Sequence, residues 1–152
     1  MALQVGDKIP NFSAKESNGT DFDSSSVLGK KPVVFYFYPK DNTPGCTAQA
    51  CSFRDQYEDF KDLGAEVIGI SSDSVQSHEK FAKRYKLPFV LLSDSDKKLR
   101  SLFGVKTNLF GLLPGRVTYV ADKNGIIKLV FDSMNATSHI PKALAIVKKF
   151  GL

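Results

Sequence analysis

Apolar residues follow two different spacings along this chain, and the spacings predict strands and helices in alternation. The run Val33–Tyr38 is apolar and aromatic throughout, which is typical of a strand covered on both faces of a sheet. From Thr47 to Leu63 apolar residues recur every three or four positions, which predicts a helix that Gly64 ends. The residues expected on its inward face are Ala50, Phe53, Tyr57, Phe60 and Leu63.

The other segments are shorter, and turn residues separate them. The pair Asn18-Gly19 predicts a hairpin near the N-terminus, because Asn-Gly suits the tight turns that join antiparallel strands. Asp73 or Ser74 is expected to cap a helix that runs to about Tyr85. The remaining expected elements are strands at 67–70 and 89–92, a helix at 97–103, a hairpin of strands 117–120 and 126–131, and a closing helix at 138–150.

This order of elements indicates the fold class. Strands that alternate with helices, followed by a hairpin and a last helix, predict an α/β protein with a central mixed sheet flanked by helices. The order fits a thioredoxin-like fold that carries an additional N-terminal β-hairpin. A length of 152 residues suits one domain, and no repeat or low-complexity linker divides the chain. We therefore expect residues 1–152 to form a single domain.

Composition and charge restrict the possible partners. The net charge of +5 comes from scattered lysines and arginines, and no basic stretch is interleaved with aromatic residues, so we expect no nucleic-acid partner. No apolar run approaches the roughly 20 residues that a membrane helix needs. The segment Met1–Gln4 lacks the features of a secretory signal. The expected location is the cytoplasm, with an organelle such as the chloroplast as the alternative if a transit peptide has been removed.

The chain has only two cysteines, Cys46 and Cys51, and they lie in one short segment. A secreted disulfide scaffold would have more of them, spread along the chain. His78 and His139 are far apart in sequence, and the Cys-x4-Cys spacing is longer than that of a short zinc knuckle, so we expect no metal. Both histidines are expected to be solvated helix residues.

The position of Cys46 favours chemistry. A buried strand ends, a loop with two prolines follows, and Cys46 falls in the first turn of the next helix. A helix start offers unpaired N–H groups and a partial positive charge, which favour the thiolate, the nucleophilic form of cysteine. Thr43 lies three residues earlier, within reach of the sulfur. From these features alone, a merely packed cysteine remains an equal alternative.

The spacing between the two cysteines predicts a conformational switch. On an ideal helix, Cα atoms five residues apart are separated by about 8.7 Å. A disulfide tolerates at most about 7 Å between Cα atoms. A bond between Cys46 and Cys51 therefore requires the first turns of the helix to unwind.

Pro39, Thr43 and Cys46 fill the positions of Pro-x-x-x-Thr-x-x-Cys, and this stretch resembles the active-site signature of the peroxiredoxins. The second cysteine, Cys51, is similar to that of the peroxiredoxin Q subfamily, also called bacterioferritin comigratory protein. One departure is Gln49, because many members have glutamate there. Further matching segments are Gly6–Phe12, Phe53–Asp55, Val67–Ser71, Leu87–Phe89, Leu91–Asp94, Pro114–Val120 and Asp122–Gly125.

The resemblance implies a role for each matched residue. Cys46 would attack the peroxide and become a sulfenic acid, and the Thr43 hydroxyl would bond the thiolate and the peroxide. Arg116 would stabilise negative charge on the reacting atoms. Pro39 would shield the pocket from water, and backbone N–H groups near Gly45 would complete the peroxide site.

The resemblance also implies the rest of the cycle and the partners. Cys51 would form an intramolecular disulfide with Cys46, and thioredoxin or a similar dithiol would reduce it. No cofactor would be needed, and members of this branch are often monomers. Two alternatives stay open: a thiol–disulfide oxidoreductase, although these generally use Cys-x-x-Cys, and a non-enzymatic redox sensor or holdase. Apolar residues of the segment Asn108–Leu113 are candidates either for an apolar approach to the site or for packing.

Overall fold

The computed structural model describes residues 2–105, 107–108 and 113–150. Within these residues, seven strands form one mixed sheet in the order β2-β1-β5-β4-β3-β8-β9. The central strand β3 pairs in parallel with β4 and antiparallel with β8. The strands of this sheet are β1 Ser13–Glu16, β2 Asp21–Asp23, β3 Val33–Phe37, β4 Glu66–Ser71, β5 Val90–Ser93, β8 Val117–Ala121 and β9 Ile127–Asp132.

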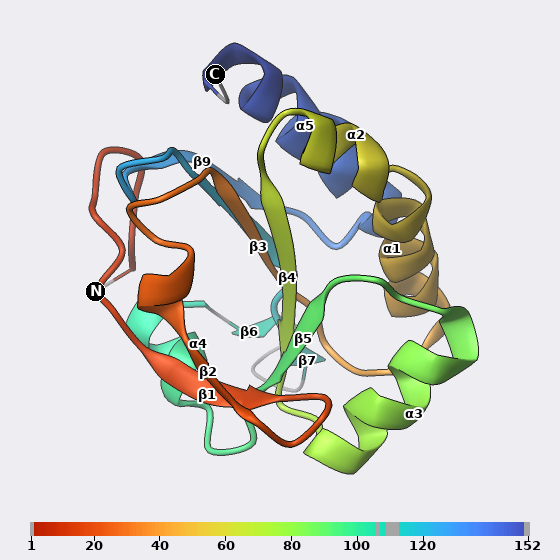
Figure 1. Cartoon of the computed structure of the whole chain (residues 1–152). Coiled ribbons are helices and arrows are strands. Elements are labelled where there is room, and N and C mark those ends of the chain that lie inside the picture. Colours follow the sequence, from red (N-terminus) through yellow and green to blue (C-terminus); the bar gives the residue numbers. More distant parts are fainter. Residues whose placement is uncertain (1, 106, 109–112, 151–152) are drawn as a thin grey trace.

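Helices cover both faces of the sheet (Figure 1). Helices α1, α2, α3 and α5 lie on one side of β3 and β4, whereas α4 and the N-terminal segment lie on the other. The helices are α1 Pro44–Asp55, α2 Tyr57–Asp62, α3 Val75–Tyr85, α4 Lys98–Phe103 and α5 His139–Phe150, with short 3-10 turns η1 Ser24–Ser26 and η2 Ala136–Ser138. The predicted α/β class with a thioredoxin-like sheet is confirmed.

Strand β3 shows why the sheet is buried on both faces. Successive side chains of a strand point to opposite faces, so its alternate residues enter two separate cores. Val34 and Tyr36 pack under α1 and α2, whereas Val33, Phe35 and Phe37 pack on the side of α4. All five are fully buried, as the uninterrupted apolar run predicts.

The N-terminal hairpin and the β8–β9 hairpin are also confirmed. Strands β1 and β2 pair antiparallel across the Asn18-Gly19 turn, in which Gly19 has a φ of +86°. A two-stranded sheet of β6 Thr107–Asn108 and β7 Leu113–Pro114 was not expected. Most of the candidate apolar approach at 108–113 lies outside the described residues.

The predicted helix from Thr47 to Leu63 differs from the structure in two ways. It begins earlier, at Pro44, because proline has no N–H to satisfy and its fixed φ suits the first helical position. It is also divided at Gln56, whose φ of −106° and ψ of 9° separate α1 from α2. No proline or glycine marks this break, so local sequence carries no signal for it. Gly64, with a φ of +77°, ends α2 as predicted.

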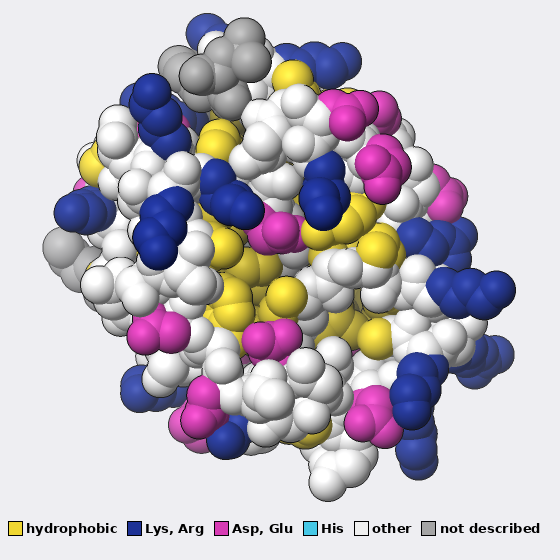
Figure 2. Space-filling view, viewed as in Figure 1, with side chains coloured by type: hydrophobic (Ala, Val, Ile, Leu, Met, Phe, Trp, Pro, Cys, Tyr) yellow, Lys and Arg dark blue, Asp and Glu magenta, His cyan; other side chains and the backbone are white. Residues whose placement is uncertain are grey.

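Charged side chains are spread over the visible face of the molecule. Figure 2 shows lysine and arginine side chains spread around this face, with apolar side chains near its centre. Among the described residues, no helix combines the length and the apolar character that crossing a membrane requires.

Candidate active site

The site begins where α1 follows β3. Thr43 occupies the N-cap position in an extended conformation, and Pro44 is the first helical residue. The first intrahelical bond runs from the Thr47 N–H to the Thr43 carbonyl, at 2.9 Å. The N–H groups of Gly45 and Cys46 precede this bond, so the helix itself provides them with no acceptor. They remain directed toward any anion bound at the helix start.

Cys46 lies in this first turn, and its side chain is buried, with 1% of the residue exposed. An Arg116 guanidinium nitrogen, Nη2, lies 3.4 Å from the Cys46 sulfur and donates to it. Arg116 immediately precedes β8 and is itself only 4% exposed. A fixed positive charge this close to the sulfur stabilises negative charge that develops at that position.

Gln49 holds the other side of this guanidinium. Its Oε1 accepts a hydrogen bond from Arg116 Nη1, and the residue is fully buried. An amide carries no charge, so Gln49 orients Arg116 without neutralising its positive charge. A glutamate at this position would neutralise that charge. The Gln49 Nε2 has no hydrogen-bond partner within the part of the chain that the structure describes.

Gly45 allows the arginine to come this close. A Cβ atom added at Gly45 would lie 3.2 Å from Arg116 Nη2, which is tighter than an ordinary contact. Any larger residue would have to displace the guanidinium by a few tenths of an ångström. The absence of a side chain at position 45 therefore has a steric reason in this structure.

Thr43 differs in detail from the expectation. Its hydroxyl donates to the Lys40 carbonyl at 2.8 Å and makes no capping bond to the helix. The donated bond therefore goes to the loop rather than to the sulfur, and the oxygen lone pairs are left to accept. Pro39 and Thr43 are both partly exposed and lie in the segment that leads from β3 to the start of α1, where Cys46 is.

Cys51 lies on the same helix and is partly buried. Both cysteines are free thiols, and α1 is continuous from Pro44 to Asp55. The structure therefore shows the reduced, helical arrangement that the sequence analysis required as the starting point of the switch.

Arg100 is a buried cation that the sequence analysis missed. Its Nη2 donates to the Tyr38 carbonyl at 2.8 Å, and its Nη1 donates to the Gly115 carbonyl at 3.3 Å. It therefore joins the end of β3 to the residue before Arg116. Burial lowers the pKa of Arg100, and the charge of Asp94 opposes this effect. Its spacing of three from Phe103, on an amphipathic helix, was a signal that could have identified it.

The expectation that both histidines are solvated is wrong, because each is fully buried. His78 contacts Asp41 Oδ2 at 2.6 Å and the Leu92 carbonyl at 2.9 Å. His139 lies 2.8 Å from Thr118 Oγ1 and 2.7 Å from the Ser133 carbonyl. Burial lowers the pKa of His139 below its ordinary value. Both side chains are tolerated inside because both ring nitrogens have partners.

One group of donor atoms in the described residues has the spacing of a metal site. Asp41, Asp73 and His78 each place a ligand atom within 4.8 Å of the others. However, Asp41 Oδ2 already accepts a hydrogen bond from Ser77, and Asp73 Oδ2 accepts one from the Asp41 N–H. The group is therefore an internal hydrogen-bonded network, for which a cation is not needed.

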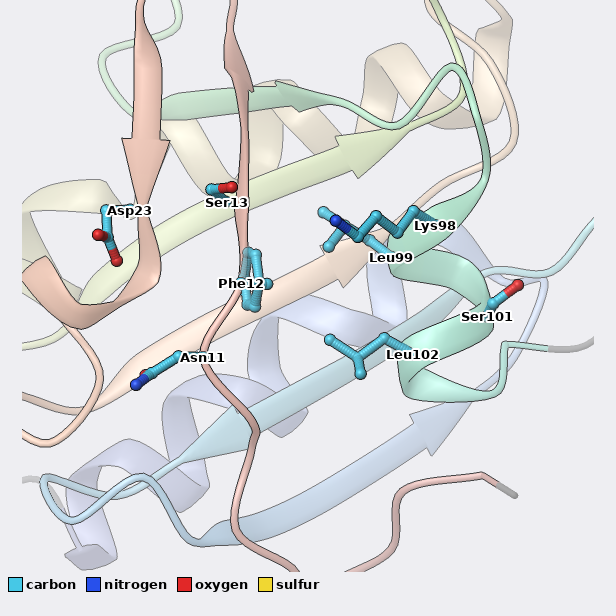
Figure 3. A pocket seen from close by; sticks show the side chains of 8 residues that line it. All are labelled: Asn11, Phe12, Ser13, Asp23, Lys98, Leu99, Ser101 and Leu102. Atoms are coloured by element: carbon cyan, nitrogen blue, oxygen red, sulfur yellow. The ribbon is translucent and has the colours of Figure 1, made fainter.

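A groove of about 670 Å³ lies away from the cysteines, between the segment before β1 and α4 (Figure 3). Phe12 faces Leu99 and Leu102 across it, and polar residues such as Lys98 and Asp23 stand at its edges. None of the predicted site residues lines it. The Cys46 sulfur thus does not line this groove.

Comparisons with known proteins agree with this geometry. A family model described as "AhpC/TSA family" matches residues 5–130. The protein named "Peroxiredoxin Q, chloroplastic" from Sedum lineare is 54% identical over 144 residues, which cover 94% of this chain and 77% of the relative.

Solved structures show the same likeness. The "Peroxidoxin BcpB" of Mycobacterium tuberculosis superposes with a TM-score of 0.89 at 37% identity and covers 97% of both chains. A structure of the bacterioferritin comigratory protein of Xanthomonas campestris, solved for insights into its alkyl peroxide reduction activity, has a TM-score of 0.85 at 31% identity. The match covers 93% of this chain and 92% of that one.

The fold and these relatives define one class of protein, the thiol peroxidases, which are oxidoreductases that reduce peroxides at the expense of a thiol. More narrowly, the chain belongs to the AhpC/TSA family, in its peroxiredoxin Q group. The resemblance that the sequence motifs indicated is confirmed.

Proposed function

We propose that Cys46 is the peroxidatic cysteine of this enzyme and that Cys51 is its resolving cysteine. The observation that carries the proposal is the Arg116 Nη2 atom 3.4 Å from the Cys46 sulfur, at a helix start that has no side-chain cap. A cation lies beside one buried sulfur in the first turn of a helix, and both the cation and the helix start stabilise an anion.

In the first step the Cys46 thiolate attacks the outer oxygen of a hydroperoxide. A sulfur–oxygen bond forms, the oxygen–oxygen bond breaks, and the leaving oxygen takes up a proton as water or an alcohol. Cysteine becomes a sulfenic acid, so sulfur loses two electrons and the peroxide gains them. Negative charge moves from sulfur to the leaving oxygen during this step, and Arg116 is placed to stabilise it.

The neighbouring residues fit supporting roles in this step. The Gly45 and Cys46 N–H groups would bind the peroxide oxygens, and the Thr43 oxygen would accept the hydrogen of the peroxide, since its own hydrogen is donated to Lys40. Pro39, on the same partly exposed loop, would limit the access of water to the sulfur.

In the second step the Cys51 thiol attacks the sulfenic acid, a disulfide forms, and water leaves. On a continuous α1 the two Cα atoms would be about 8.7 Å apart, which is too far for a disulfide. The first turns of α1 therefore have to unwind before this bond forms.

A dithiol then returns the enzyme to its reduced form by thiol–disulfide exchange, and we propose thioredoxin or a similar protein for this role. The substrates that we propose are hydrogen peroxide and organic hydroperoxides. The alkyl peroxide reduction activity of the related Xanthomonas campestris protein supports the organic class.

Two cysteine variants test the assignment. Replacing Cys46 with serine should reduce peroxide consumption with a thioredoxin system by about a thousandfold or more, since the nucleophile is lost. Cys51→Ser should retain the first reaction with one equivalent of peroxide but lose rapid recycling by thioredoxin. Full turnover by Cys46→Ser would end the proposal. Insulin reduction by the native enzyme would instead indicate a thiol–disulfide oxidoreductase, and stoichiometric rather than catalytic peroxide loss would indicate a sensor.

Three further features belong to the proposal. Residues 1–152 would fold as one domain, which the single sheet shared by both cores supports. The enzyme would be a monomer, which light scattering in both redox states would test. Its location would be the cytoplasm, with the chloroplast as the alternative suggested by the names of the plant relatives, and imaging of a tagged full-length gene product would decide between them.

A further inference from the structure

The loop that leads from β3 to α1 is held by a buried carboxylate, that of Asp41. Three side chains contact this carboxylate: the Tyr38 hydroxyl at 2.6 Å, the Ser77 hydroxyl at 2.8 Å and His78 Nδ1 at 2.6 Å. The Asp41 N–H donates to Asp73 Oδ2 at 2.8 Å. Both the backbone and the side chain of this one loop residue are therefore fixed by other elements, mainly by α3.

The hydrogen positions in this network follow from its chemistry. The Leu92 carbonyl can only accept, so His78 Nε2 must carry a hydrogen and donate it at 2.9 Å. Two lone pairs cannot face each other at 2.6 Å, so one hydrogen also lies between His78 Nδ1 and Asp41 Oδ2. Since the side chains of both residues are almost completely inaccessible, solvent does not replace either contact.

The anchored stretch carries the candidate catalytic groups of the loop. Pro39 precedes Asp41 by two residues, and Thr43 follows it by two. Asn42, between Asp41 and Thr43, has a φ of +63°, a left-handed conformation that asparagine adopts more readily than most residues with a side chain. The network around Asp41 fixes the loop immediately before this turn.

The downstream side of the reactive turn is anchored as well. Phe53 is fully buried, and its ring stacks on Tyr36 with a centroid separation of 4.6 Å. Between Asp41 and Phe53, the buried residues of α1 are Cys46, Gln49 and Ala50. The segment that must unwind for the disulfide thus lies between two fixed points.

We propose that Asp41 and His78 are positioning residues: they hold the active-site loop in its reactive form and form the fixed hinge from which α1 unwinds. This proposal rests on the roles proposed above for Cys46 and Cys51. The anchor acts on the geometry of the first step, in which the peroxide meets a fixed sulfur, hydroxyl and N–H groups. The anchor does not affect the second step, because the first turn of α1 has unwound before the disulfide forms.

A matched pair of variants at His78 separates this role from general stability. In His78→Asn the amide nitrogen can replace Nδ1 and keep the bond to Asp41, whereas the bond to Leu92 is lost. In His78→Gln the amide nitrogen can replace Nε2 and keep the bond to Leu92, whereas the bond to Asp41 is lost. Each variant loses one buried hydrogen bond, so their losses of stability should be comparable.

Only the loss of the Asp41 bond should change the first step. The chain has no tryptophan, so the two steps are followed by quenched flow, thiol alkylation and mass spectrometry rather than by tryptophan fluorescence. We expect His78→Gln to slow sulfenic acid formation about tenfold and His78→Asn to stay within about threefold of the native rate, as for a misplaced reacting group. Disulfide formation should be unchanged in both, after correction for the folded fraction.

Equal first-step rates in the two His78 variants would overturn the anchor, as would equal slowing of both steps. If neither variant folds, Asp41→Asn and Asp41→Ala provide the same test, because asparagine keeps an acceptor for Tyr38 and alanine keeps none. Should the native enzyme fail to form the Cys46–Cys51 disulfide at all, the proposed function fails instead, and the two failures are thereby distinguished.

Amide exchange in the native enzyme tests the hinge without any variant. The Thr47 N–H bonds to Thr43 within the turn, and the Asp41 N–H bonds to Asp73 outside it. After oxidation by one equivalent of peroxide, we expect Thr47 to lose protection and Asp41 to keep it, measured by NMR. Loss of protection at both amides would show that the unwinding passes through Asp41 and would overturn the hinge.

Discussion

Helices α1 and α3 begin at the same end of the sheet, after the neighbouring parallel strands β3 and β4, yet their first turns differ. At α3 the N-cap residue Ser74 accepts a hydrogen bond from the Ser77 N–H at 3.1 Å. At α1 the N-cap residue Thr43 gives no such bond and directs its hydroxyl to Lys40. A side-chain cap satisfies one of the first N–H groups of its helix, whereas an uncapped start leaves that group for an anion.

This difference connects structure with chemistry. Cys46, the proposed peroxidatic cysteine, lies in the turn that lacks a side-chain cap and that has to unwind in the proposed cycle. The capped α3 supplies Ser77 and His78, which hold the loop before α1. One helix start is therefore adapted for reaction, and its neighbour provides the fixed support.

The largest expected effect comes from removing the cation at the start of α1. Arg116→Met should slow the reaction of Cys46 with hydrogen peroxide by about a hundredfold to a thousandfold, the usual cost of losing one donor to a developing negative charge. The rate is measured by competition with a second peroxidase. Arg84→Met removes an exposed charge of the same sign on α3 and is the control. A loss of less than about tenfold in the Arg116 variant would contradict the role assigned to this side chain.

The next largest effects should come from removing the hydroxyl of each N-cap residue, Thr43 of α1 and Ser74 of α3. Thr43→Val should slow the peroxide reaction about tenfold or more with little change in stability, because its hydroxyl serves the site rather than the helix. Ser74→Ala should cost about 1 kcal/mol of stability and leave the rate unchanged, because its hydroxyl serves the helix. Peroxide kinetics and urea unfolding measure the two effects. The comparison breaks down if Ser74→Ala slows the reaction as much as Thr43→Val does.

His139, the first residue of α5, should make the stability of the protein depend on pH. Burial keeps the pKa of His139 below its ordinary value, so the folded state binds a proton there less readily than the unfolded chain, which does so below about pH 6.5. Stability should therefore fall as the pH decreases through 6.5, with a slope of at most about 1.4 kcal/mol per pH unit from this group. His139→Gln, which can keep the bond to Ser133, should show a shallower decrease in urea midpoint. Identical pH profiles for the native enzyme and His139→Gln would exclude His139 as a source of the pH dependence of stability.

The smallest expected effect is at Gly45. Gly45→Ala should stabilise α1 slightly, since alanine favours helix by up to about 1 kcal/mol over glycine. The added Cβ should displace Arg116 and lower the peroxide rate about threefold, an estimate for a shift well below 1 Å. Unfolding and peroxide kinetics on the same samples check both signs. A variant that is more stable and equally fast would show that this close contact does not matter.

Local pattern predicted most of the elements for clear reasons. The apolar run at Val33–Phe37, the Asn18-Gly19 turn and the periodicity after Pro44 each reflect short-range sterics or the burial of one face. The break at Gln56 was missed because no proline or glycine marks it.

Some features of the candidate site were likewise predicted from local sequence, and others were not. The placement of Cys46 at a helix start follows from the loop that precedes it. The burial of His78 and Arg100 was missed, although each lies three residues before a buried phenylalanine on its helix. A polar side chain is stable inside only if distant segments supply its partners, and periodicity does not identify those partners.

The sequence by itself determined the class of fold and the helix start under Cys46, because these depend on neighbouring residues. Ideal helix geometry adds the prediction that α1 unwinds if the proposed disulfide forms. Tertiary structure alone decided that Arg116, 70 positions away, touches the sulfur, and that His78, 37 positions from Asp41, holds the loop. Such contacts arise when the sheet brings remote strand ends together. Their distances and burial are therefore properties of the assembled fold.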